Sequence, residues 1–194
     1  MKIVCQNKKY LLDSVWLKVR QDELLVDGNK TIDDYYVTEN PDVALVVAIT
    51  KNNEVILKTE YRYAADQVLT EIPGGSFRLA EELPLDSAKR ELKEETGYES
   101  DQWELLAKTY DNPPRETSTV FLYLARNCIL TSEQQLDEFE YISLRLVTFQ
   151  EAINMVLSNE ICVNSSASAL MRCAMMYPEL LTKGAEGLGP KNIK

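Results

Sequence analysis

The pattern of hydrophobic and polar positions predicts a mixture of strands and helices. The longest uninterrupted apolar run, residues 43–49, has the length of a buried strand. Asn52 and Asn53 follow as a turn, and the apolar segment after them completes a predicted hairpin over residues 43–62. A short strand is predicted over residues 68–72, where the chain reaches two adjacent glycines.

The first 40 residues show shorter apolar and aromatic segments separated by turn residues. We predict three strands here, over residues 10–20, 23–26 and 34–38. Asp27-Gly28 and Asn29 supply the turn chemistry between the last two strands. The predicted organisation is a small N-terminal antiparallel sheet, a main domain and a flexible tail, over residues 1–40, 41–182 and 183–194.

The remainder of the main domain mixes both kinds of element. A helix is predicted over residues 84–96, because Pro84 suits the first helical turn and Gly97 suits the position after the last turn. Three strands and two more helices are predicted after it, over residues 102–110, 117–125, 141–147, 149–158 and 166–177. Strands and helices do not alternate strictly, so the pattern predicts an α+β fold with a mixed sheet and helices layered on it.

Composition and charge exclude several classes of protein. The chain has 194 residues, of which 45% are hydrophobic and 27% are charged, and its formal net charge is −10. Such a charge repels nucleic-acid phosphates, so we expect no nucleic-acid partner. The chain has no histidine, which excludes Ser-His-Asp and Cys-His catalysis as well as histidine metal ligands.

The sequence favours a cytoplasmic protein. Its apolar runs are far shorter than the ~20 residues that cross a bilayer, so we expect no membrane partner. The first residues lack the apolar stretch of a signal peptide. The four cysteines are scattered and include no CxxC pair, so free thiols in a reducing cytoplasm fit better than disulfides.

The predicted helix places acidic side chains beside its apolar face. Leu85, Ala88 and Leu92 recur at helical spacing and are expected to face the core. Glu91 and Glu95, one turn apart, lie at the edge of that face, whereas the lysines of the helix lie on its opposite side. Like charges at this spacing destabilise an isolated helix by roughly 0.2–0.5 kcal/mol. We therefore expect a cation to relieve the repulsion.

A hard divalent ion meets this requirement best, because the chain offers carboxylate oxygens but neither histidine nor a cysteine pair. Gly74 and Gly75 let the backbone approach the helix and present a carbonyl as a further oxygen ligand. Arg90 can pair with a loop carboxylate such as Glu82 and so fix the loop. The alternative is an acidic helix surface that is only solvated. On the repulsion argument, Glu95→Gln is expected to leave folding intact or slightly improved.

The segment GGSFRLAEELPLDSAKRELKEETGY resembles the signature of the Nudix hydrolases, G-x5-E-x7-R-E-U-x-E-E-x-G-U, in which U is a bulky aliphatic residue. From Glu82 onward the spacing matches up to the final glycine. Two features depart from it. Six residues rather than five separate Gly75 from Glu82, and Tyr98 stands at the last aliphatic position.

This resemblance implies a fold and a cofactor. The fold would be a Nudix-like α/β/α sandwich with a mixed sheet, preceded by a small N-terminal antiparallel sheet. The cofactor would be Mg²⁺, with Mn²⁺ as an alternative. The residues that the resemblance implies as metal ligands are Gly74 through its carbonyl, Glu91, Glu95 and Glu140, and Glu94 is implied as a catalytic residue or a further ligand.

The segments TEYRYAADQVLTEIPGG and LDEFEYISLRLVTFQEAI resemble the ADP-ribose pyrophosphatase branch of the same family. The resemblance implies that Arg62 binds the diphosphate and that Glu138 accepts the proton of the attacking water. It also implies a homodimer joined through the N-terminal sheet, whose aromatic residues often clamp the adenine. Candidates for that contact are Trp16, Tyr35 and Tyr36, although aromatic residues in strands also serve packing.

The expected function is Mg²⁺-dependent hydrolysis of the diphosphate bond of a nucleoside diphosphate sugar, foremost ADP-ribose to AMP and ribose 5-phosphate. The motif contacts only the diphosphate and the metal, so another nucleoside diphosphate sugar, a dinucleoside polyphosphate or a damaged nucleotide stays open as substrate. Two further alternatives are a non-catalytic nucleotide-sensing Nudix module that regulates a partner, and a structural domain stabilised by Mg²⁺ or Ca²⁺. A sensor is expected to have lost ligands from the helix or to carry an appended DNA-binding region, and the sequence shows neither.

Overall fold

The computed structural model describes residues 1–15 and 17–182. These residues fall into two compact units. One comprises Met1–Asp42 with Tyr110–Thr119, and the other comprises residues 43–109 with 120–182. The predicted tail and Trp16 lie outside the described residues.

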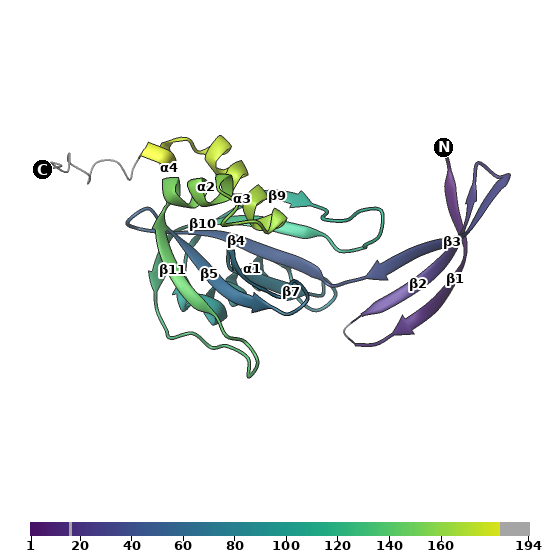
Figure 1. Ribbon diagram of the computed structural model, residues 1–194, viewed down its shortest axis with the longest axis horizontal. Helices are drawn as coiled ribbons and strands as arrows, with labels where there is room; N and C mark the ends of the chain where they lie inside the picture. The colour runs from purple at the N-terminus through teal and green to yellow at the C-terminus, as the bar shows by residue number, and fades with distance from the viewer. Residues whose placement is uncertain (16, 183–194) are drawn as a thin grey trace, which may run out of the picture. The chain divides into compact units, whose positions relative to one another are not determined.

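The N-terminal unit is a three-stranded antiparallel sheet in the order β1-β2-β3 (Figure 1), whose strands are β1 (Ile3–Asp13), β2 (Lys18–Val26) and β3 (Lys30–Glu39). Asp27 and Gly28 form the predicted turn between β2 and β3, both with positive φ, 49° and 75°. The single strand predicted over residues 10–20 is wrong. The Ser14 backbone N–H donates to the Leu17 carbonyl at 3.1 Å, and this turn separates β1 from β2. The segment contains no glycine, proline or asparagine, and apolar residues stand on both sides of Asp13 and Ser14, so the sequence pattern did not mark the turn.

The second unit is built on a mixed sheet. Its strands are β4 (Asp42–Thr50), β5 (Glu54–Arg62), β6 (Gln67–Glu71), β7 (Gly74–Phe77), β8 (Tyr98–Glu99), β9 (Gln102–Thr109), β10 (Val120–Leu130) and β11 (Ser143–Thr148). The order is β11-β5-β4-β10-β8, with β6 paired to β5, β7 to β4 and β9 to β10. The central pair β4–β10 is parallel, whereas β5 pairs with β11 and β6 in antiparallel register.

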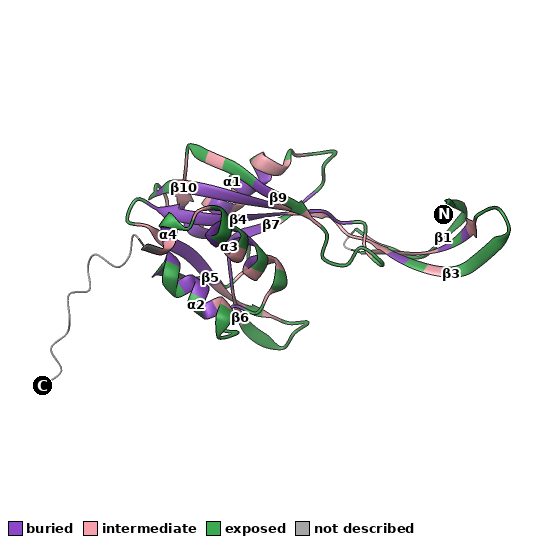
Figure 2. Ribbon diagram, turned by 90° about the horizontal axis from the view of Figure 1, so that it is seen from above, coloured by how far each residue is buried: buried purple, intermediate pink, exposed green. Residues whose placement is uncertain are grey.

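Helices cover both faces of this sheet. Helix α1 (Pro84–Thr96) lies on one face, and α2 (Phe149–Leu157) and α3 (Asn164–Met176) lie on the other (Figure 1). Alternate residues of β4 point to opposite sides. Val46 packs with Leu92 of α1, while Val47 joins the cluster under the other two helices. Strands β4 and β10 are accordingly buried for most of their length (Figure 2).

The predicted hairpin over residues 43–62 opens soon after its turn. Strands β4 and β5 pair at Ile49 and Val55, beside the Asn53 turn residue, whose φ is 61°. Farther along, β6 runs beside β5 and the chain then crosses to β4, where the Val46 N–H donates to the Pro73 carbonyl at 2.9 Å. The segment between β6 and β7 thus connects β5 to β4 where these two strands no longer pair directly.

The predicted α+β fold with a mixed sheet and layered helices is confirmed. Helix α1 has the predicted limits, and Gly97 ends it in the left-handed conformation, with φ 74°. Helix α2 begins at the Thr148 N-cap, whose hydroxyl accepts from the Glu151 N–H. The short helix α4 (Glu179–Thr182) follows Pro178 and was not predicted. No helix among the described residues is long and apolar enough to cross a membrane.

Candidate functional site

The two adjacent glycines bring the start of β7 against α1 and β4. Gly74 has a φ of 144°, and a Cβ there would clash with the Ala44 carbonyl oxygen. A Cβ on Gly75 would clash with the Glu91 carboxylate. Position 74 therefore requires glycine because of its positive φ and the backbone clash, whereas a side chain at position 75 would displace the Glu91 carboxylate. The Glu91 side chain lies directly against the backbone at Gly75, the close approach predicted from the sequence.

Helix α1 places its glutamates at graded depths. Ala88 and Leu92 are fully buried, and Glu95 beside them is only 4% exposed. Glu91 is intermediate, and the side chain of Glu94 is 41% exposed. The helical wheel therefore gave the correct face for Glu91 and Glu95.

Glu95 has a cationic partner that was not predicted from the sequence. Its carboxylate accepts a 2.8 Å hydrogen bond from the Gly74 N–H and forms an ion pair with the Lys58 ammonium group. Lys58, on β5, is 2% exposed. Its Nζ also lies 3.5 Å from the Gly74 carbonyl oxygen and 3.6 Å from Glu60 Oε2.

A signal for Lys58 was present in the sequence. In the segment EVILKTEYR, Lys58 is a charged residue that directly follows three apolar residues of a predicted strand. Ile56, two positions earlier, packs on the α1 side of the sheet. Because side chains two apart in a strand point to the same face, Lys58 had to face α1.

Arg90 forms ion pairs with three glutamates at the outer side of α1. Its Nε and Nη2 donate to Glu82 at 3.1 and 2.9 Å, which confirms the predicted pair. Its Nη1 donates to Glu91 at 2.8 Å and to Glu94 at 2.9 Å. The Glu82 N–H donates to the Arg78 carbonyl at 3.0 Å. The longer loop after Gly75 therefore ends in a turn that is tied to α1.

Tyr98, the second departure from the motif, is accommodated by packing. It lies just after α1 and contacts the cluster that contains Ala88 and Leu92. The aromatic ring thus serves as a bulky apolar group at this position.

Burial perturbs the two inner carboxyl groups. It is the largest cause that raises the pKa of Glu95, to about 7, and the Lys58 ammonium opposes this shift. Burial likewise raises the pKa of Glu91, and Arg90 opposes it. Both carboxylates are therefore costly to ionise inside the protein, and added positive charge stabilises them.

Arg62 lies at the end of β5 and is held by two acids. Its Nε and Nη2 donate to the two carboxylate oxygens of Glu71, both at 2.9 Å. Its Nη1 lies 3.1 Å from Glu60 Oε2. The Glu71 hydrogen bonds are the largest cause that raises the pKa of Arg62. Glu60 thus lies near both Lys58 and Arg62, and it links the two cations of β5.

The late acidic loop is attached to the C-terminal turn of α1. The Gln134 side chain donates to the Glu95 carbonyl at 2.6 Å, and the Gln135 N–H donates to the Glu94 carbonyl at 2.8 Å. Glu140 accepts from the Asp137 N–H at 3.1 Å. The neighbouring Glu138 is exposed. The anchoring role of Gln134 was not predicted from the sequence, and the roles of Glu138 and Glu140 stay predictions.

Tyr35 and Tyr36 belong to β3 of the N-terminal unit. The Tyr35 hydroxyl donates to the Pro114 carbonyl at 2.7 Å, and the Arg115 guanidinium lies 6.0 Å from its ring centre. Tyr36 lines a cavity of about 300 Å³ in the same unit, with Val19, Val37, Thr38, Asn112, Arg115 and Glu116. The third aromatic candidate, Trp16, lies outside the described residues.

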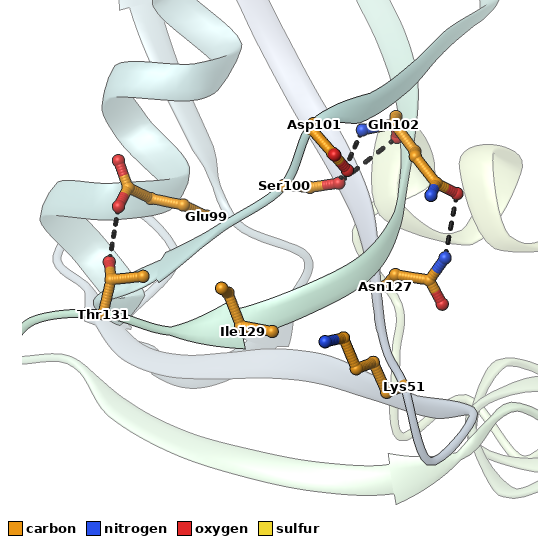
Figure 3. A pocket seen from close by; sticks show the side chains of 8 residues that line it. All are labelled: Lys51, Glu99, Ser100, Asp101, Gln102, Asn127, Ile129 and Thr131. Atoms are coloured by element: carbon orange, nitrogen blue, oxygen red, sulfur yellow. Dashed lines mark hydrogen bonds between the residues drawn. The ribbon is translucent and has the colours of Figure 1, made fainter.

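A larger cavity, of about 580 Å³, lies elsewhere in the second unit (Figure 3). It is lined by Lys51, Glu99, Ser100, Asp101, Gln102, Asn127, Ile129 and Thr131. None of these is a predicted site residue. The Asn127 and Gln102 side chains are joined by a 2.9 Å hydrogen bond across its wall (Figure 3).

The donor set around the glycines suits a hard divalent ion. It consists of carboxylate oxygens and a backbone carbonyl, which Mg²⁺ and Mn²⁺ prefer to softer ligands. The described residues hold no group of three Asp, Glu or Cys side chains already arranged around a metal position. Instead, Arg90 and Lys58 each hold one of the inner carboxylates. An ion that binds here would share Glu91 and Glu95 with these two side chains.

Comparisons with known proteins agree on one family. A family model described as NUDIX domain matches residues 39–162. The ADP-ribose pyrophosphatase of Bacillus subtilis (strain 168) is 30% identical over 135 residues, which cover 69% of this chain and 72% of that protein. The methanol dehydrogenase activator of Bacillus methanolicus is 32% identical over 128 residues, which cover 64% of this chain and 68% of that protein.

Two further matches extend over more of the chain. The ADP-ribose pyrophosphatase of Mycobacterium tuberculosis (strain ATCC 25618 / H37Rv) is 28% identical over 152 residues, 78% of this chain and 72% of that protein. A crystal structure of an ADP compounds hydrolase superposes with a TM-score of 0.81 and covers 92% of this chain and 96% of that one. Its sequence identity is 19%, so this likeness concerns the fold.

Proposed function

The chain belongs to the Nudix family as a hydrolase related to the ADP-ribose pyrophosphatases, and from this premise we propose that it hydrolyses the diphosphate bond of a nucleoside diphosphate sugar with the help of Mg²⁺. ADP-ribose is the foremost substrate, with AMP and ribose 5-phosphate as products. The observation that carries the proposal is the placement of Glu91 and Glu95 on α1 beside Gly74 and Gly75.

The residues of this chain have distinct tasks in the proposed reaction. Glu91, Glu95, Glu140 and the Gly74 carbonyl would hold the divalent ions, with Glu94 as a further ligand or catalytic group. When bound, Mg²⁺ or Mn²⁺ neutralises diphosphate oxygens and lowers the pKa of a bound water. Glu94, Glu95 and the late loop are already connected through Gln134 and Gln135, which supports a shared site.

The proton and the diphosphate are assigned to two other side chains. Glu138 accepts the proton of the water that attacks phosphorus, as the phosphoanhydride bond to the leaving phosphate breaks. Arg62 binds the diphosphate oxygens through its guanidinium. Its Nη1 and Nη2 now contact Glu60 and Glu71, so the substrate competes with these carboxylates for the same N–H groups.

The N-terminal unit is proposed to join two copies of the chain. Strand β1 is exposed along its whole length, including Ile3, Tyr10, Leu11 and Leu12. A three-stranded sheet with so many exposed apolar side chains gains stability when a partner covers it. Tyr35 and Tyr36 are proposed to contact the adenine. The proposed compartment is the cytoplasm, where the thiols of the four free cysteines stay reduced.

One relative supports a second candidate function. The protein of Bacillus methanolicus that resembles this chain is a methanol dehydrogenase activator. The second candidate is therefore regulation of a partner enzyme by this chain as a nucleotide sensor.

A hydrolysis panel tests the main proposal. Purified protein is incubated with Mg²⁺ or Mn²⁺ and with ADP-ribose, other nucleoside diphosphate sugars, dinucleoside polyphosphates or nucleoside triphosphates, and the products are identified by chromatography. We expect AMP and ribose 5-phosphate from ADP-ribose, loss of turnover in Glu91→Gln, and unchanged turnover in Asp86→Asn, a charge change on an exposed position of α1. Absence of hydrolysis across the panel would contradict the proposal and favour the second candidate.

A further inference from the structure

Lys58 is among the largest fully buried side chains of the protein as described, and it carries a charge. It lies in the middle of β5, directly after Val55, Ile56 and Leu57, all of which are fully buried apolar residues. Burying an ammonium group costs several kcal/mol before any pairing is counted. An apolar side chain of similar length would fill the same space without that cost. The presence of lysine here therefore calls for an explanation beyond packing.

The contacts of the ammonium group supply that explanation. Lys58 Nζ pairs with Glu95, donates toward the Gly74 carbonyl at 3.5 Å and lies 3.6 Å from Glu60. Glu95 and the Gly74 carbonyl are two of the four proposed metal ligands. The ammonium group thus occupies a position from which a cation contacts both Glu95 and the Gly74 carbonyl.

We propose that Lys58 is a resident cation of this site, which supplies the positive charge at Glu95 and the Gly74 carbonyl in place of one divalent ion. The chain then binds one divalent ion fewer than the same oxygen atoms would hold without the ammonium group, and Glu91 is the main carboxylate left for an ion from solution. This inference rests on the proposed function, because both place the diphosphate and its ions beside Glu91 and Glu95.

Electrostatics gives the direction of the effect. A divalent ion that approached Glu95 would lie next to a positive charge that solvent does not screen, since Lys58 and Glu95 are both buried. One oxygen of Glu95 accepts from Lys58 and the other from the Gly74 N–H. Removal of the ammonium group frees one of these Glu95 oxygens and the Gly74 carbonyl. It also removes the repulsion between the ammonium group and an approaching divalent ion. Divalent ions are then expected to bind more tightly and in greater number.

Metal titration in the absence of substrate tests this inference. The protein and its Lys58→Met variant are freed of metal with a chelator, and Mn²⁺ is titrated while free Mn²⁺ is followed by electron paramagnetic resonance and the heat by calorimetry. We expect Lys58→Met to bind one Mn²⁺ more per chain and to bind Mn²⁺ at least tenfold more tightly. Lys89→Met removes the same charge from an exposed position of α1 and is expected to match the unaltered protein.

The opposite results overturn the inference. Equal stoichiometry and affinity in Lys58→Met would show that the ammonium group does not occupy an ion position. Weaker Mn²⁺ binding, with a native circular dichroism spectrum, would show that Lys58 only orients Glu95. If Lys58→Met does not fold, Lys58→Gln is judged by the same criteria, since its amide keeps a donor toward Glu95 without the charge.

Failure of the proposed function is distinguishable from failure of this inference, because the titration uses no substrate. A gain of one Mn²⁺ in Lys58→Met, together with no hydrolysis in the substrate panel, would leave the inference standing and reject the proposed reaction. Hydrolysis of ADP-ribose by a protein whose Mn²⁺ stoichiometry does not depend on Lys58 would support the proposed reaction and reject the inference. If neither protein binds Mn²⁺, the inference is rejected.

Discussion

Lys58 and Glu95 form a buried ion pair that connects β5 to α1 behind Gly74. The two residues are 37 positions apart in the sequence, and each is less than 5% exposed. The pair provides, from within the chain, the positive charge that the crowded glutamates of α1 require. It also changes what is expected when one of the partners is replaced.

Lys58→Met is expected to destabilise the metal-free protein. The substitution leaves the Glu95 carboxylate buried with the hydrogen bond from the Gly74 N–H but without its counter-ion. Loss of one partner of a buried ion pair costs about 3 kcal/mol. Urea unfolding of metal-free protein at about pH 8, above the pKa of Glu95 of about 7, measures the change. The double variant Lys58→Met/Glu95→Gln removes both charges and is expected to recover most of the loss. Equal stability of Lys58→Met and the unaltered protein would contradict the ion pair.

The stability of the metal-free protein is expected to fall as the pH rises from about 4.5 to about 7. Burial raises the pKa of Glu95 from 4.5 to about 7, so within this window the folded chain holds a proton that the unfolded chain has released. A folded state that binds more protons loses stability as the pH rises. The loss attributable to Glu95 is about 3 kcal/mol, since the pKa of about 7 already includes the opposing effect of Lys58.

The measurement for this pH dependence is urea unfolding in steps of pH with a chelator present. Glu95→Gln cannot titrate at this position, so the difference between its pH profile and that of the unaltered protein isolates the carboxyl group. The free energy of unfolding of the unaltered protein minus that of Glu95→Gln is expected to fall as the pH rises. If it stays constant or rises, the raised pKa is contradicted.

Local sequence patterns predicted the parts of the site that are close in sequence. The limits of α1, the burial of Glu95 and the need for glycine at Gly74 all follow from helical spacing and turn chemistry within a few residues. The Arg90–Glu82 pair was also predictable, because it spans eight positions at the start of α1.

The contacts that were missed join distant segments. Lys58 reaches Glu95 across the sheet, and Gln134 reaches the same residue from the late loop, 39 positions away. No local pattern encodes such contacts, since they depend on how β5, α1 and the loop are placed by the sheet. The turn between Ser14 and Leu17 was missed for a different reason, because no glycine, proline or asparagine marks it in the sequence.

Arg62→Ala is expected to weaken diphosphate binding. With ADP-ribose as substrate, KM is expected to rise at least tenfold and kcat to fall less, because the guanidinium acts on the bound diphosphate more than on the leaving group. Steady-state kinetics with Mg²⁺ measures both constants. Arg145→Ala, a change of the same residue type on the neighbouring strand β11, is the control and is expected to leave both constants unchanged. Unchanged constants in Arg62→Ala would show that Arg62 serves only its pairs with Glu60 and Glu71.

Glu138→Gln is expected to lower kcat with little effect on KM. The amide keeps the size of the side chain but cannot accept the proton of the attacking water, and loss of such a group costs roughly 10²–10⁴-fold in rate. The measurement is steady-state hydrolysis of ADP-ribose from about pH 6 to about pH 9, a range that lies above the ordinary pKa values of carboxyl groups. Glu133→Gln is the matched control, because Glu133 is an exposed glutamate of the same loop. A proton acceptor predicts that the rate loss in Glu138→Gln persists at saturating substrate and Mg²⁺. Recovery of the full rate under those conditions would instead assign Glu138 to metal or substrate binding.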